Sequence, residues 1–324
     1  MVDNDFDAIQ RRSRTRPTTT NKRVTAQPRD ILWFEKIHQH GPLSTSFLHG
    51  FSKHNHHSEK STNQRLTDLF NEDNTPQHGT FLQRPHQQLR TIDSRYNELV
   101  YDLTPASISM LKKAELWKKQ STKRSGPWLH NYMVSCITAS IELATSEREE
   151  ITFIPQSKIL ARANTELKYS TQFVEPNNGK TITKDIIPDA LFGLEYKHSG
   201  KSYFRFFLVE ADRGTEPSTT KNFNRKSHLR NLLQYEDYIG NGRYKNHLNL
   251  TAPLLVLNVF SDRIKLKKMI DLIETASSSR GNPYMLFQYF EEFDESFKPP
   301  KPNFSLLNSG WQRAGKSDFN IGEI

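Results

Sequence analysis

Two stretches of this chain decide its fold: Ile187-Pro188-Asp189-Ala190 and Leu208-Val209-Glu210-Ala211-Asp212. Each lies in an apolar segment with the length of a β-strand. Residues two apart on a strand point to the same face, so Glu210 and Asp212 project together, and pairing of the two strands would bring Asp189 beside them. The sequence therefore predicts three carboxylates gathered on neighbouring strands of one sheet.

Carboxylates that lie this close repel one another when they are ionised. A hard divalent cation such as Mg²⁺, which takes oxygen ligands and keeps several waters, would relieve that repulsion. A plainer interpretation stays open, because Pro-Asp is a common turn former and residues 210–214 read equally as a polar strand end that enters a loop.

Further helices and strands are predicted on either side of these two strands. Residues 130–144 carry apolar side chains at three- and four-residue steps, which predicts a long amphipathic helix. The order helix, strands, helix, strand, helix is typical of a mixed α/β domain whose central sheet is covered on both faces. Strands are expected at residues 151–154, 186–194, 203–211 and 254–260, and later helices at residues 226–239 and 264–276.

Pro188, Asp189 and Glu210 resemble the motif of the PD-(D/E)XK nuclease superfamily, in which two adjacent strands hold Mg²⁺ and activate water. The resemblance implies that Asp189 and Glu210 are metal ligands and catalytic residues. The lysine of that motif is replaced here by Asp212, and that lysine normally helps to position or polarise the attacking water. Asp212 stays among the candidate catalytic residues despite this departure from the motif.

The resemblance also suggests where the missing groups come from. Some members of the superfamily supply the basic group from the following helix, so Lys226 is expected in that role, with Arg225 as the alternative. Glu142, on the first helix, resembles the carboxylate that many members add as a further metal ligand; a solvated helix residue is its other interpretation.

Shorter elements precede this part of the chain. Amphipathic helices are expected at residues 31–37, 44–51 and 58–70, and Ser58 is a suitable N-cap for the third. A hairpin-like stretch follows, and then Thr104-Pro105 opens a further helix, with Thr as N-cap and Pro at the first helical position. This order of elements resembles the winged helix-turn-helix family.

In that family the third helix enters the major groove, where Asn and Gln bond adenine edges and Arg or Lys bond guanine or phosphates. The resemblance thus implies double-stranded DNA as a partner. A helical linker, or a winged helix used for protein contacts, are the alternatives. The residues expected to face DNA are Lys60, Asn63, Gln64 and Arg65 on the third helix and Arg84, Arg90 and Arg95 in or near the wing.

Composition narrows the class of protein. The chain has 45 Lys and Arg against 36 Asp and Glu, and its net charge of +9 suits a polyanionic partner such as nucleic acid. The single cysteine, Cys136, excludes an intramolecular disulfide and points to a reducing compartment. Because neither a membrane span nor a signal peptide is present in the sequence, we expect a cytoplasmic protein outside the membrane. The oligomeric state stays open.

The composition also changes along the chain. Residues 1–28 are polar and rich in Thr and Arg, and we expect them to form a disordered basic arm. Residues 118–128 have the composition of a linker. These limits divide the chain into an arm at 1–28, a winged-helix domain at 29–117, a linker at 118–128, a nuclease-like domain at 129–315 and a tail at 316–324.

A closer resemblance is to the replication-relaxation family of plasmids and mobile elements, which pairs a winged helix with such a nuclease-like domain. It rests on the phrases Pro188-Asp189-Ala190-Leu191-Phe192 and Glu210-Ala211-Asp212-Arg213-Gly214-Thr215, on the helix 229–238 and on residues 254–263. The resemblance implies a DNA-binding protein of a mobile element, with replication or mobilisation proteins as further candidate partners. Its nuclease-like domain either cleaves DNA weakly with Mg²⁺ or only grips it. The alternative function is a transcription factor or adaptor whose α/β domain contacts proteins.

Overall fold

The chain folds into two compact units in a computed structural model. The model describes residues 14, 16–54, 58–74, 79–89, 97–118, 126–214, 216–219, 222–276, 281–293 and 298–324. Unit 1 comprises Met1–Lys118, Ser135–Leu143 and Glu295–Asn303, and unit 2 comprises Lys119–Val134, Ala144–Asp294 and Phe304–Ile324. Within the described ranges, no helix has the length and apolar character needed to cross a membrane.

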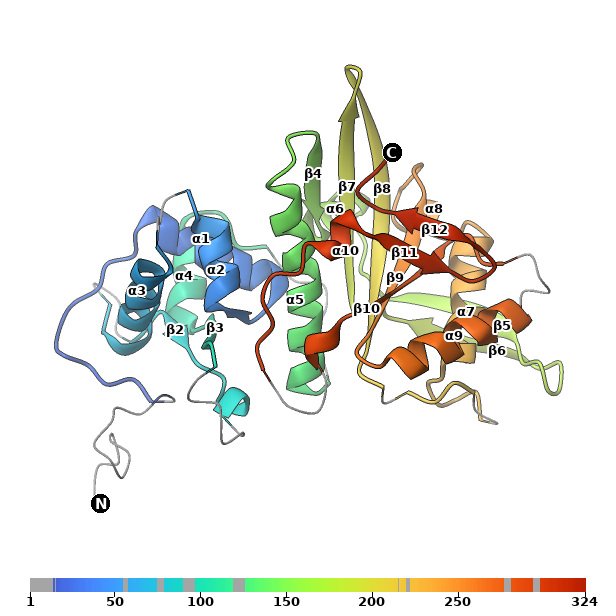
Figure 1. The fold of residues 1–324 in the computed structure, drawn as a ribbon, viewed down its shortest axis with the longest axis horizontal. Coiled ribbons are helices and arrows are strands. Elements are labelled where there is room, and N and C mark those ends of the chain that lie inside the picture. The colour runs from blue at the N-terminus through green and yellow to red at the C-terminus, as the bar shows by residue number, and fades with distance from the viewer. Residues whose placement is uncertain are drawn as a thin grey trace. The chain divides into compact units, whose positions relative to one another are not determined.

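Unit 1 is built from short helices around a small antiparallel sheet with the strand order β1-β3-β2. Its core contains Trp33, Phe34, Phe47, Leu66 and Tyr101, none of which exposes any surface. The elements are α1 (Pro28–His40), β1 (Leu43–Ser44), α2 (Thr45–Ser52), α3 (Glu59–Asn71), β2 (Leu82–Gln83), a 3₁₀ turn (His86–Leu89), β3 (Val100–Leu103) and α4 (Pro105–Lys113), as Figure 1 shows.

Local sequence signals set the ends of these helices. The side chain of Ser58 accepts the backbone N–H of Ser61, which confirms the expected cap of α3. Thr104 and Ser107 exchange the two hydrogen bonds of a capping box, and Pro105 occupies the first helical turn of α4. Helices α3 and α4 therefore start where the sequence predicts, whereas α1 starts three residues before the expected Ile31.

The segment before α1 differs from the expected disordered arm. Thr19 and Thr20 hydrogen-bond the carboxylate of Glu72 at the end of α3, and Val24 is buried with its N–H bonded to the carbonyl of Asp73. Composition did not reveal this, because the partners of the threonines lie some fifty positions away. The remaining residues of the expected arm, 1–13 and 15, lie outside the described residues.

Unit 2 contains a seven-stranded mixed sheet with the order β12-β11-β10-β9-β8-β7-β4. Strands β8, β9 and β10 run parallel and the other pairs are antiparallel. The strands are β4 (Ile151–Pro155), β5 (Tyr169–Val174), β6 (Thr181–Ile186), β7 (Ala190–His198), β8 (Lys201–Asp212), β9 (Leu254–Phe260), β10 (Met285–Tyr289), β11 (Gly310–Arg313) and β12 (Lys316–Asn320), of which β5 and β6 form a separate hairpin. The expected α/β fold with a central mixed sheet is confirmed.

Helices α7 and α9 cover one face of this sheet (Figure 1). Tyr235 of α7 and Met269 and Ile273 of α9 pack in one core cluster with Leu208 of β8 and Val256 of β9. The helices and turns of unit 2 are α5 (Trp128–Thr145), α6 (Gln156–Ala163), α7 (His228–Tyr235), a π-helical turn η3 (Glu236–Gly240), α8 (Tyr244–His247), α9 (Arg263–Ala276), η4 (Glu291–Phe293) and α10 (Ser305–Asn308). The middle of α5, residues 135–143, belongs to unit 1.

The last residues of the chain extend the sheet where a tail was expected at 316–324. Strand β12 pairs antiparallel with β11, and the hydroxyl of Tyr196 donates a hydrogen bond to the carbonyl of Ile321. Trp311 is completely buried, and its indole N–H bonds the carbonyl of Leu306. The short strands β11 and β12 lack a clear apolar alternation, which explains why periodicity did not predict them.

Candidate functional site

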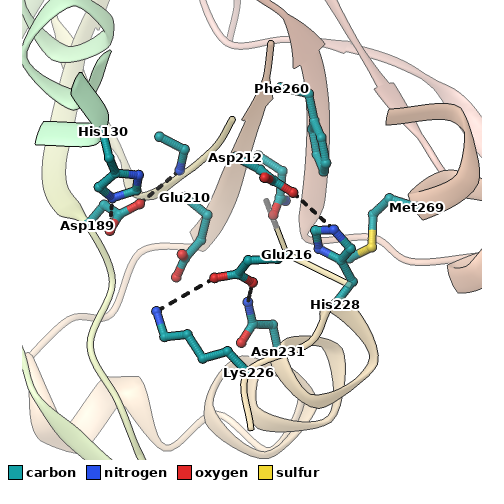
Figure 2. A pocket seen from close by; sticks show the side chains of 12 residues that line it. His130, Asp189, Glu210, Asp212, Glu216, Lys226, His228, Asn231, Phe260 and Met269 are labelled. Atoms are coloured by element: carbon teal, nitrogen blue, oxygen red, sulfur yellow. Dashed lines mark hydrogen bonds and ion pairs between the residues drawn. The ribbon is translucent and has the colours of Figure 1, made fainter. Parts of the chain in front are cut away.

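The register between β7 and β8 creates the candidate site. Ala190 lies opposite Val209 in this antiparallel pair, so Asp189, one residue before β7, lies across from Glu210. A pocket opens at this end of the two strands, and Asp189, Glu210 and Asp212 all line it. Figure 2 shows the three predicted carboxylates around one pocket, together with side chains from α5 and α7. The structure therefore brings together the residues on which the sequence-based hypothesis depends.

Asp189 is held from two sides. One carboxylate oxygen accepts the backbone N–H of Ala211 at 2.9 Å, and the other lies 3.0 Å from Nε2 of His130 on α5. The hydrogen bond with Asp189 raises the pKa of His130, although partial burial opposes the shift. His130 thus places a proton donor against the first carboxylate.

Glu210 lies between Asp189 and Tyr235. Burial, and next the negative charge of Asp189, raise the pKa of Glu210 to about 8, while Lys226 and the hydrogen bond from Tyr235 oppose the shift. The Tyr235 hydroxyl donates that bond, and burial together with Glu210 raises the pKa of Tyr235 well above its ordinary value. Glu210 is consequently protonated at neutral pH when no cation is near, which removes the repulsion from Asp189.

Asp212 occupies the place of the lysine in the nuclease motif. One of its carboxylate oxygens accepts the N–H of Gly214 at 2.7 Å, and the other lies 3.0 Å from Nε2 of His228. His228 is the first residue of α7, and Ser227 caps that helix by accepting the N–H of Arg230. The local helix start therefore delivers an imidazole to the side of Asp212.

Lys226 also lines the pocket, as the sequence predicts. Its side chain is 60% exposed, and its ammonium lies 3.9 Å from the carboxylate of Glu216. Such an exposed, loosely held ammonium is free to change its rotamer and meet an anionic ligand at the mouth of the pocket. Arg225, the alternative basic residue, is exposed and does not line this pocket.

Sequence reasoning missed two histidines of the site. His130 lies one turn into α5, and its only sequence signal is a polar residue at the start of an otherwise apolar helix. His228 follows Lys226 and the cap Ser227, so its proximity to the predicted basic residue was a usable signal.

Glu142, the predicted third metal ligand, is not part of this pocket. Its carboxylate lies 2.7 Å from Nζ of Lys36 and 2.6 Å from Nε2 of the buried His40, both on α1. Burial would raise the pKa of Glu142, but the hydrogen bonds and charges of His40 and Lys36 outweigh it and lower the pKa to about 2. Glu142 is twelve residues beyond His130 on α5, about 18 Å along the helix, so the two side chains serve different units.

The predicted DNA-facing residues divide into two groups. Lys60, Asn63 and Gln64 are exposed on α3. Arg65 instead binds the fully buried carboxylate of Asp30 at 2.6 Å and donates to the carbonyl of Thr25.

Arg84, predicted for the wing, is also held within unit 1. Its guanidinium lies over the ring of Phe70 at 3.9 Å and donates to the hydroxyl of Tyr101. The remaining wing residues of the prediction, Arg90 and Arg95, lie outside the described residues. Of the seven predicted DNA contacts, three are therefore exposed, two are tied into the fold and two are not described.

The side chains of the pocket limit the kind of metal site that it could form. In the described part of the chain, no three His, Cys, Asp or Glu side chains are grouped so that they could hold a metal ion. Magnesium is, however, often bound through one or two carboxylates with water completing the shell. Asp189 and Glu210 lie opposite each other at the end of two neighbouring strands. They fit a Mg²⁺ site in which two carboxylates are the protein ligands.

Comparison with known families agrees with the resemblance in the sequence. Residues 34–254 match the family model described as Replication-relaxation, which covers well over half of the chain. The matched span contains α3 and all of the pocket residues discussed above. Asn258, Phe260 and Met269, which also line the pocket, lie beyond it. Comparisons with curated proteins and with solved structures gave no match.

The environment of Glu142 predicts a structural role. Replacing Glu142 by Gln should lower the free energy of unfolding by about 3 kcal/mol, because Lys36 and His40 lose a buried charge partner. Urea denaturation measures this change, with the exposed Glu149→Gln as the matched control. An unchanged stability in Glu142→Gln would contradict the role.

The raised pKa of Glu210 predicts a pH dependence. Between the ordinary value near 4.5 and about 8, the folded chain keeps a proton on Glu210 that the unfolded chain releases, so stability falls as the pH rises through this window. The fall should be on the order of 1 kcal/mol per pH unit in a chelating buffer, and Glu210→Gln should abolish it. Urea denaturation across the window, with the exposed Glu166→Gln as control, checks the prediction; equal slopes in wild type and Glu210→Gln would contradict it.

Proposed function

The chain belongs to the replication-relaxation family, and from that premise we propose that it binds double-stranded DNA and nicks it during replication or relaxation of a plasmid or other mobile element. In this proposal unit 1 is a winged helix that docks on the duplex, and unit 2 is a PD-(D/E)XK-type domain that carries the cleavage site. The observation that carries the nuclease part is the pair Asp189 and Glu210, which face each other across β7 and β8 at the pocket.

The element order of unit 1 supports the winged-helix assignment. Three helices, a small antiparallel sheet and a closing helix follow one another, and α3 is the third helix in that order. Its exposed Lys60, Asn63 and Gln64 carry the donors and acceptors that read base edges and phosphates in a major groove. Arg65 and Arg84 are left out of the proposed interface because their guanidinium groups are already engaged inside the unit.

The pocket of unit 2 supports the cleavage part. Asp189 and Glu210 would hold Mg²⁺, which supplies Lewis-acid stabilisation of a phosphodiester and a more acidic bound water. His130 orients Asp189 by its hydrogen bond, and Tyr235 orients Glu210. Lys226, exposed at the pocket, would bind a non-bridging phosphate oxygen and take over part of the role of the absent motif lysine.

One observation favours a second candidate, in which unit 2 grips DNA without cutting it. Each pocket carboxylate already has a protein partner: His130 for Asp189, Tyr235 for Glu210 and His228 for Asp212. A pocket whose carboxylates lie against such partners can keep its shape without a cation. The cleavage assay below separates the two candidates.

The proposed DNA interface predicts a loss of affinity in α3. The variant Lys60→Ala/Asn63→Ala should bind duplex DNA at least about tenfold more weakly, and the salt slope should fall by about one unit for the lost phosphate contact. Fluorescence anisotropy with labelled mixed-sequence duplexes measures both quantities. The exposed Lys113→Ala on α4 is the charge control. Equal affinity of the α3 variant and the control would exclude α3 as the reading helix.

The proposed cleavage site predicts a cation-dependent nicking activity. Wild type should convert supercoiled plasmid to the open circle with Mg²⁺ or Mn²⁺, and Asp189→Ala should lower the rate about a hundredfold or more. Asp185→Ala, an exposed carboxylate of β6 that pairs with Lys168, is the matched control. If wild type and Asp189→Ala both bind DNA and neither nicks above background, the endonuclease is excluded and the gripping domain stands.

A further inference from the structure

The hairpin of β7 and β8 extends past the rest of the sheet. Strand β4 pairs with β7 as far as Tyr196, with one more backbone bond from the N–H of Lys197 to the carbonyl of Glu150, and β9 pairs with β8 only from Phe206 onward. In the part of the chain that the structure describes, residues 198–204 pair with no strand outside this hairpin. Figure 1 shows the two strands projecting as a free two-stranded ribbon. We call residues 197–204 the ribbon tip.

The turn at the end makes the ribbon tip a defined element. Ser199 and Gly200 form a two-residue turn in which both φ angles are positive, 50° and 74°. Such turns match the right-handed twist of the strands they join, and glycine accepts this conformation without strain. Just behind the turn, the hydroxyl of Ser202 donates to the carboxylate of Glu195 across the strands at 2.7 Å. The projecting ribbon therefore has a regular register up to its tip.

Each face of the ribbon tip carries one lysine and one aromatic residue. Lys201 and Tyr203 are two residues apart and share one face. Lys197 lies opposite Ser202, so it shares the other face with Phe204. The two aromatic residues are 44% and 40% exposed, and both lysines are exposed as well. Each face thus presents one cation and one aromatic ring.

We propose that the ribbon tip is a second DNA-contacting element, which enters the major groove of the duplex. The groove of B-DNA is wide enough for a two-stranded ribbon, and lysines on both faces would meet the phosphates on both walls. Tyr203 and Phe204 would contact the apolar base edges, such as thymine methyl groups. The inference rests on the proposed DNA-binding function and does not depend on nicking.

Charge and shape favour DNA over a protein partner. The ribbon tip contains two lysines and a histidine and no acidic residue, and the carboxylate of Glu195, which lies opposite Phe204, already accepts a hydrogen bond from Ser202. The exposed aromatic area is divided between two faces, so it does not form the single contiguous apolar patch that protein docking uses. A groove that contacts both faces of the ribbon at once matches this distribution.

Two variants test the ribbon tip. Lys197→Ala/Lys201→Ala should lower the salt slope of duplex binding by nearly two units and weaken binding at least about tenfold near 0.1 M salt. Tyr203→Thr/Phe204→Thr keeps a strand-forming residue at both positions and should weaken binding with an unchanged salt slope. Lys267→Ala/Lys268→Ala, which removes two exposed lysines of α9, is the charge-matched control and should leave both quantities close to wild type. Mixed-sequence labelled duplexes and fluorescence anisotropy give the affinities, and thermal melting verifies that each variant is folded.

The outcomes separate this inference from the proposed function. If wild type binds no duplex, the proposed DNA-binding function fails. If wild type binds and the lysine variant matches the α9 control, the ribbon tip is not a DNA contact and the inference is overturned. Loss of affinity in the lysine variant with no loss in the α9 control supports the inference.

Discussion

The pairing of β7 with β8 in one register is the constraint on which the candidate site depends. Side chains alternate between the two faces of a strand, so a slip by one residue would turn Asp189 away from Glu210 and remove the carboxylate pair. The apolar residues of both strands hold the register, because Leu191, Phe192 and Phe207 fill the core only in this alignment. Packing of the sheet thus forces two acidic groups together at one end of β7 and β8.

That proximity has an electrostatic cost, which the surrounding side chains offset in different ways. Glu210 holds a proton up to about pH 8 and accepts a hydrogen bond from Tyr235. Asp189 lies against His130, and Asp212 lies against His228. A lysine in place of Asp212 would supply positive charge directly; here an Asp–His pair and the exposed Lys226 bring positive and polar groups to the same pocket. Where the resemblance in the sequence leads one to expect a lysine, the pocket therefore holds an Asp–His pair with an exposed lysine nearby.

Local sequence patterns were sufficient to predict the fold and the strand residues of the site. The roles of the other residues depend on contacts between distant parts of the chain, which such patterns do not show. Strand alternation was sufficient for Asp189, Glu210 and Asp212, because consecutive strands usually pair. The helical period of α5 could not show that His130 serves the pocket while Glu142 serves unit 1, since both positions are polar. Arg65 looked like a free surface cation because its partner, Asp30, is distant in the sequence and completely buried.

The contacts of the segment before α1 explain which part of α3 remains open. Lys22 forms an ion pair with Asp68, and Thr19 and Thr20 hydrogen-bond Glu72. The carbonyl of Thr25 accepts a hydrogen bond from Arg65. These contacts cover the later turns of the helix. Lys60, Asn63 and Gln64 lie in its first two turns, which is also the part of a recognition helix that meets base edges. The positive end of the helix dipole lies there as well, and it adds to the attraction for phosphate. In the proposed complex, these contacts leave the first two turns of α3 open for the duplex.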